Sequence, residues 1–181
     1  TEDGRAQVYM VMECLEGEDA RARLTREGPY PPRVLARVAA QVAETLAAAH
    51  EKGVLHRDLK PDNIFLCVVD GDRDFVKVLD FGAAKAFGEG REHHLTRPGV
   101  AMGTPEYMSP EQILGDPLDA RVDAYGLGVV CYELLTGSLP FTADTTAALL
   151  ALHTDEPPPS PSKHRATAPS IPPALEAVVL R

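Results

Sequence analysis

Apolar residues recur at helical spacing between positions 34 and 49 of the chain. Steps of three and four residues place such side chains on one face of a helix. We therefore predict a long helix over about 31–52, which ends near Gly53. The residues on its apolar face are Val34, Val38, Val42, Leu46 and Ala49.

A second segment, over about 123–136, is apolar nearly all round. A helix of that composition is typically buried on every side, and Gly137 is a suitable stop. A third helix is predicted over about 144–153. The proline-rich segment 156–162 that follows is expected to be extended, because proline denies donors to helix and sheet.

Two β-branched and aromatic runs, 64–69 and 75–79, are separated by residues 70–74, which have the composition of a turn. This pattern predicts a β-hairpin. The hairpin would bring Asn63, just before the first strand, and Asp80, just after the second, to the same end of the pair.

The chain has 181 residues, 44% of them hydrophobic, which suits one globular domain. Its formal charge of −9 disfavours nonspecific binding to nucleic acid or anionic lipid. No apolar run approaches the roughly 20 residues that a spanning helix needs. Cys14, Cys67 and Cys131 are far apart and lie in apolar runs, so we expect buried reduced thiols in a cytoplasmic protein rather than disulfides or a metal site.

The chemistry of the chain concentrates in 56–63 and 80–82. Asp58 can orient a hydroxyl group and accept its proton, and Lys60 can lie against a phosphate. Asn63 and Asp80 offer the hard oxygen ligands that Mg²⁺ prefers. A base, a cation and two metal ligands in this order predict phosphoryl transfer.

Further motifs follow in a fixed order: 8–17, then 103–111, 123–128 and 133–141. Together with 56–63 and 80–82, they resemble the protein-kinase superfamily, and within it the eukaryotic-like serine/threonine kinases of bacteria. The resemblance implies an α+β, protein-kinase-like fold with a mainly helical C-lobe, a small β-hairpin and a largely missing N-lobe. Residues 1–18 would be the last N-lobe strand and the hinge, and 19–181 a C-lobe truncated before its last helices.

Several family features are not found in the chain. The Gly-rich phosphate loop, the strand lysine and its glutamate partner do not precede Val8, and the arginine that pairs with Glu111 in relatives is missing. We therefore expect the isolated fragment to be inactive. We also expect it to be poorly stable, because an unpaired buried partner costs about 3–5 kcal/mol.

The resemblance assigns a nucleotide site whose residues could equally serve core packing. Asp19 would reach the ribose, although Ala20 replaces a usually larger residue. The residues implied at the adenine are Met12, Glu13, Cys14, Leu15 and Phe65.

The resemblance also implies roles around Asp58. Arg57 would meet a phosphate on the activation segment, for which Thr96 is the candidate site. Thr104 would hydrogen-bond near Asp58 and Lys60, and Asp123 would accept backbone N–H groups of the catalytic loop, although it could also cap its helix. His56 is expected to pack under Phe81 and not to act in catalysis.

The resulting interpretation is a serine/threonine protein kinase that uses ATP with Mg²⁺, or Mn²⁺ in its place, acts on protein substrates and autophosphorylates in bacterial signalling. Two alternatives stay open: a pseudokinase that acts as a scaffold, and a small-molecule phosphotransferase of the aminoglycoside type. Dimerisation through the missing N-lobe and a membrane tether outside the fragment also stay open.

Overall fold

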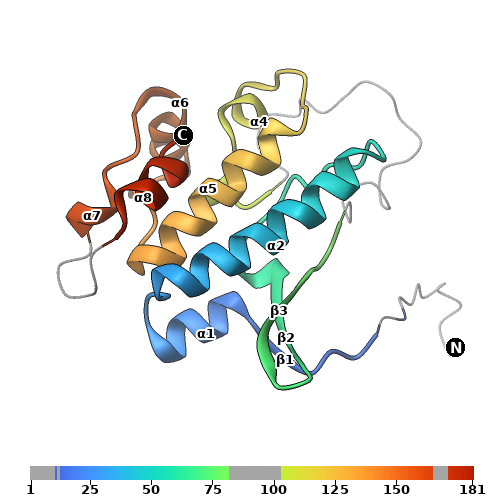
Figure 1. Ribbon diagram of the computed structural model, residues 1–181. Helices are drawn as coiled ribbons and strands as arrows, with labels where there is room; N and C mark the ends of the chain where they lie inside the picture. Colours follow the sequence, from blue (N-terminus) through green and yellow to red (C-terminus); the bar gives the residue numbers. More distant parts are fainter. Residues whose placement is uncertain (1–10, 12, 82–102, 165–170) are drawn as a thin grey trace, which may run out of the picture.

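The computed structural model describes residues 11, 13–81, 103–164 and 171–181 (Figure 1). The first half contains β1 (Gly17–Asp19), α1 (Ala20–Glu27), α2 (Pro32–His50), the 3-10 helix η1 (Pro61–Asn63), β2 (Ile64–Val69) and β3 (Asp72–Val78). The second half contains the 3-10 helix η2 (Pro105–Tyr107), α4 (Pro110–Leu114), α5 (Arg121–Thr136), α6 (Thr146–Asp155), α7 (Pro161–His164) and α8 (Pro173–Val179). A mainly helical fold with one small sheet is what the sequence predicts.

Helices α2 and α5 lie side by side at the centre of the molecule (Figure 1). The predicted bounds of both helices are correct to within two residues, and Gly137 ends α5 in the left-handed conformation. The predicted apolar face of α2 needs one correction, because Val34 and Ala49 are only half-buried while Leu35 is fully buried. The α2 side of the core consists of Leu35, Val38, Val42 and Leu46.

The three strands form one antiparallel sheet in the order β1-β2-β3, which lies against α1 and α2 (Figure 1). Strands β2 and β3 pair from Ile64 opposite Val78, which confirms the hairpin. The predicted five-residue turn is wrong, since only Asp70 and Gly71 form it. Both have positive φ (50° and 83°), as an Asp-Gly hairpin turn requires.

Strand β1 was not predicted. It pairs with β2 so closely that a Cβ on Gly17, which has a φ of 145°, would lie 2.0 Å from the carbonyl oxygen of Leu66. A three-residue strand has too few positions to show an alternating pattern, so its only sequence signal is this glycine.

The proline-rich segment also differs from expectation, because α7 begins at Pro161, within the stretch predicted to be extended. Proline is tolerated in the first turn of a helix, where its missing N–H would have no intrahelical partner. Helix α6 begins two residues later than predicted, because the Thr145 hydroxyl accepts from the backbone N–H of Ala148 at 3.2 Å and caps it.

All three cysteines are free thiols, and Cys67 and Cys131 are buried. Burial raises the pKa of Cys131 to about 12. Cys14 is exposed, so the expectation of three buried thiols is wrong for this residue. Among the described residues, no helix combines the length and the apolar character that crossing a membrane would require.

Candidate active site

The segment 56–63 lies between α2 and β2 and is held by Asp123, near the start of α5. The Asp123 carboxylate is 1% exposed and accepts hydrogen bonds from the backbone N–H groups of His56 and Arg57, each at 2.8 Å. The ring Nε2 of His50 lies 2.7 Å from the same carboxylate. Asp123 is not the N-cap of α5, which is Ala120. One buried side chain thus fixes the path of the backbone just before Asp58.

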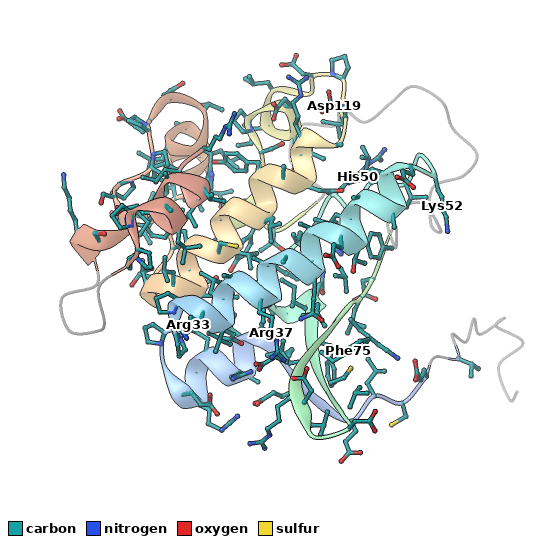
Figure 2. All side chains as sticks on the ribbon, viewed as in Figure 1. Arg33, Arg37, His50, Lys52, Phe75 and Asp119 are labelled. Carbon is teal, nitrogen blue, oxygen red and sulfur yellow. The ribbon has the colours of Figure 1, made fainter. Side chains whose placement is uncertain are left out.

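His50 was not identified from the sequence. It occupies the last position of α2 (Figure 2), 73 residues before its partner Asp123. A basic residue in the last turn of a helix is ordinary, since it complements the helix dipole. Nothing local therefore distinguishes His50 from a terminal histidine exposed to solvent.

Arg57 has a φ of 68°, which is unusual for a residue other than glycine. Such a conformation costs about 1–3 kcal/mol and persists only where the surroundings impose it. Here the backbone N–H of Arg57 donates to Asp123, and its carbonyl oxygen accepts from Gln112 Nε2 at 2.8 Å. The buried Nε of Arg57 has no hydrogen-bond partner in the described part of the chain.

Asp58, Lys60 and Thr104 form a compact group. The Oδ1 atom of Asp58 accepts from the backbone N–H of Thr104 at 2.8 Å, and its Oδ2 atom lies 3.4 Å from Lys60 Nζ. Lys60 Nζ donates to the Thr104 hydroxyl at 3.1 Å. The hydrogen bonds expected of Thr104 are therefore present. The Asp58 side chain stays 38% exposed and accessible to an incoming hydroxyl group.

Asn63 and Asp80 flank the open end of the hairpin, as the sequence predicts. The backbone N–H of Leu79 donates to the carbonyl oxygen of Asn63 at 2.8 Å and closes this end. Asn63 Nδ2 donates to the Asp58 carbonyl oxygen at 2.9 Å, which leaves the amide oxygen of Asn63 available as a ligand atom. Asp80 is exposed and has a φ of 60°. Two hard oxygen donors on one edge have the chemistry that a site for Mg²⁺ requires.

His56 is a buried structural residue in this arrangement. Its Nε2 atom lies 2.9 Å from the Leu79 carbonyl oxygen, and its ring packs edge-on against Phe81 with the centroids 5.0 Å apart. The prediction that His56 packs against Phe81 is confirmed. His56 thereby ties the catalytic loop to the segment that carries Asp80.

The residues proposed for the adenine are only partly placed. The Glu13 carboxylate pairs with Lys77 Nζ, and Lys77 lies opposite Phe65 in the sheet. Phe65 and Leu15 are half-buried, whereas Glu13 and Cys14 are exposed. Met12 lies outside the described residues, as does Thr96.

Asp19 has a structural task that the sequence analysis did not assign. Its Oδ1 atom accepts from the backbone N–H of Ala22 at 2.7 Å and caps α1. An aspartate immediately before a helix is a recognisable signal for such a cap. The ribose role proposed for Asp19 would use the acceptor sites of the carboxylate that the cap leaves free.

Glu111 lies in the first turn of α4 and is half-exposed. The expected instability rests on the loss of an arginine partner from a buried pair, and it stays a prediction. Gln112, which follows it, was missed although Ser109 and Gln112 have the spacing of a capping box. Besides capping α4, Gln112 binds the carbonyl oxygen of Arg57.

The family model described as protein kinase domain matches residues 2–172. The serine/threonine-protein kinases Pkn1 and pkn3 of Myxococcus xanthus are 47% and 45% identical over 96% and 99% of this chain, which covers 24% and 32% of their lengths. PknB of Mycolicibacterium smegmatis is 39% identical over 96% of this chain and 26% of its own length. The chain thus spans at most about a third of these relatives, and it belongs to the protein kinase family, as a bacterial kinase of the eukaryotic-like type.

Proposed function

We propose that the protein carrying this chain is a serine/threonine protein kinase that transfers the γ-phosphate of ATP to hydroxyl groups of protein substrates in bacterial signalling. The observation that carries the proposal is the group formed by Asp58, Lys60 and Thr104. Asp58 presents a carboxylate to the hydroxyl group, and Lys60 supplies a cation whose Nζ atom lies 3.4 Å from that carboxylate.

These groups account for each bond and proton of the transfer. The substrate oxygen forms a bond to the γ-phosphorus as the bond from that phosphorus to the bridging oxygen of ADP breaks, and the hydroxyl proton passes to Asp58. Lys60 stabilises the charge on the transferring group.

Members of this family use ATP with a divalent cation, and the site chemistry suits that use. Asn63 and Asp80 would hold Mg²⁺, or Mn²⁺ in its place, through oxygen atoms. The bound ion would neutralise phosphate charge. The adenine and ribose would lie against residues 12–15, Asp19 and Phe65.

Arg57 supports a proposed switch by phosphorylation. Its Nε is buried and has no partner among the described residues, and a guanidinium group with unused donors is well suited to a phosphate. We propose that autophosphorylated Thr96 supplies that phosphate. We also propose that this domain is cytoplasmic. Dimerisation or a membrane tether would depend on other parts of the protein.

The decisive experiment uses the complete natural polypeptide with Mg·ATP, beside Asp58→Asn and the control Asp144→Asn, which changes an exposed aspartate elsewhere. We expect phosphate incorporation into Ser or Thr of proteins to fall by at least about a hundredfold in Asp58→Asn and to persist in Asp144→Asn. Mass spectrometry would locate the modified residues and test Thr96.

Two results would contradict the proposal. Intact nucleotide binding without any transfer would indicate a pseudokinase. Transfer to aminoglycosides in place of proteins would indicate the small-molecule class.

A further inference from the structure

A second group of charged side chains lies beside the candidate active site, and the function proposed above does not use it. The group, called here the Arg21 cluster, consists of Arg21 from α1, Asp62 from η1, Tyr107 from η2 and Glu133 from α5. Four elements that are distant in sequence thus meet at one guanidinium group.

The centre of the cluster is a network of hydrogen bonds and ion pairs. Both terminal nitrogens of Arg21 donate to the Glu133 carboxylate, one of them at 3.2 Å, and one also donates to the Tyr107 hydroxyl. The Tyr107 hydroxyl donates to Glu133 at 2.6 Å. Arg21 Nε lies 3.6 Å from an oxygen of Asp62. All three guanidinium nitrogens therefore face acidic or phenolic oxygens.

The charges of the cluster do not cancel. Two carboxylates face one guanidinium group, and the unbalanced charge is on the accessible side, because the Asp62 side chain is 51% exposed while Glu133 is 5% exposed. Burial alone would lower the pKa of Arg21, but its hydrogen bonds and charge interactions with Glu133 and Tyr107 together outweigh this and raise the pKa. Burial and the hydrogen bond to Glu133 raise the pKa of Tyr107. Arg21 therefore stays a cation and Tyr107 a donor at neutral pH.

The position of the cluster gives it a relation to the substrate. Asp62 immediately precedes Asn63, and Tyr107 lies three residues after Thr104, which contacts both Asp58 and Lys60. A polypeptide that presents a hydroxyl group to Asp58 must pass close to these segments. A cationic side chain near its phosphorylated residue would meet Asp62 and, without Arg21, the Glu133 carboxylate.

We propose that Arg21 is a specificity-determining residue, which fills from within an acidic subsite that Asp62, Tyr107 and Glu133 would otherwise offer to an arginine of a polypeptide substrate. The inference rests on the proposed kinase function and deepens it by naming a substrate preference. The unaltered kinase has no requirement for arginine at this substrate position. Removal of Arg21 creates a selective pocket for it.

The test compares peptides that are identical except for arginine or alanine at each position around the phosphorylated residue. In the complete kinase, the ratio of kcat/KM for the arginine and alanine peptides is expected to be near one, and in Arg21→Ala to rise about tenfold or more at one position. The control is Arg23→Ala, on the same helix, which loses a pair with Asp74 and leaves the cluster intact. Its ratio should match the unaltered kinase.

Two additions keep the test decisive where Arg21→Ala folds poorly. Arg21→Met retains an apolar stem, and added guanidinium can take the vacated position of the missing group. For this variant the peptide ratio should fall back towards one as the guanidinium concentration rises. The double variant Arg21→Ala/Glu133→Gln has no buried charge in the Arg21 cluster and should show no gain in selectivity.

The inference is overturned if active Arg21→Ala has the same peptide ratio as the unaltered kinase. It is also overturned if Arg21→Met has that ratio at every guanidinium concentration, including zero. If the role of Arg21 were purely structural, the variants would be less stable than the unaltered kinase but would have the same peptide ratio. An unaltered protein that phosphorylates no peptide or protein at all would refute the proposed function instead.

Discussion

Helix α5 carries two buried carboxylates ten positions apart, Asp123 and Glu133, and they bind different kinds of donor. Asp123 accepts from the backbone N–H groups of His56 and Arg57 as well as from His50. Among the described residues, the donors to Glu133 are the side chains of Arg21 and Tyr107. The Asp123 end of the helix thus holds the backbone just before Asp58. The Glu133 end holds the side chains of Arg21 and Tyr107.

This difference has a consequence for what each residue can determine. Backbone donors are present whatever the loop sequence, so Asp123 fixes geometry and leaves little room for variation. Side-chain donors change with single substitutions, so the surroundings of Glu133 can vary without altering the backbone. We infer that the Asp123 end sets whether transfer can occur, and that the Glu133 end influences which polypeptide is accepted.

The largest effect is expected for Asp123→Ala. Loss of the carboxylate leaves buried N–H groups without an acceptor, at about 1–3 kcal/mol each, so the free energy of unfolding should fall by about 3–5 kcal/mol. Phosphate transfer should fall with it, since Asp58 is displaced. Urea unfolding and transfer assays on the complete protein would measure both.

The control for Asp123→Ala is Asp119→Asn, four residues earlier and labelled in Figure 2. Asp119 pairs with Arg121 at the surface, where ion pairs contribute about 0–1 kcal/mol. Its unfolding free energy should change by less than about 1 kcal/mol. Equal losses in the two variants would contradict the role given to Asp123.

A smaller effect is expected for Glu133→Gln. The amide retains an oxygen that accepts from Arg21 or Tyr107, but it loses the charge, and hydrogen bonds to charged groups contribute about 1.5–3 kcal/mol. We expect a stability loss of about 1–3 kcal/mol, with kcat nearly unchanged because Glu133 does not hold the backbone beside Asp58. A fall in kcat as large as that of Asp123→Ala would erase the proposed distinction between the two carboxylates.

Features with a local signal could be predicted from the sequence. The apolar spacing of α2, the continuous burial of α5 and the Asp-Gly turn each depend on neighbouring residues, and the hairpin brought Asn63 and Asp80 to one edge as expected. The hydrogen bonds of Asp123 and Thr104 followed from the kinase motifs. In these cases the chain segment that forms the structure also carries its pattern.

Features that depend on distant partners could not be predicted. Arg21 and Glu133 are 112 residues apart, and His50 and Asp123 are 73 apart. Before folding brings them together, Arg21 resembles any other arginine on the charged face of a short helix. The start of α7 at Pro161 was not predicted for a different reason. The first turn of a helix and an extended segment both tolerate proline.

The smallest effect is expected from a third buried polar residue, His153, which packs on α5. Its Nδ1 atom lies 2.6 Å from the Tyr125 hydroxyl, and its ring packs against Tyr125 and Phe141. The buried Nε2 has no partner in the described part of the chain. Burial lowers the pKa of His153, against an opposing contribution from Glu106.

The sign of the resulting pH dependence follows from proton counts. Below about pH 6.5, the ordinary pKa of histidine, the unfolded chain binds a proton at His153 that the folded chain excludes, so acid favours unfolding. The free energy of unfolding should therefore fall from pH 7.5 to pH 5.5 more steeply in the unaltered protein than in His153→Gln. Parallel urea titrations at the two pH values would measure this difference. Identical pH slopes would mean that His153 is protonated as readily in the folded protein as in the unfolded chain, and that burial beside α5 does not keep it neutral.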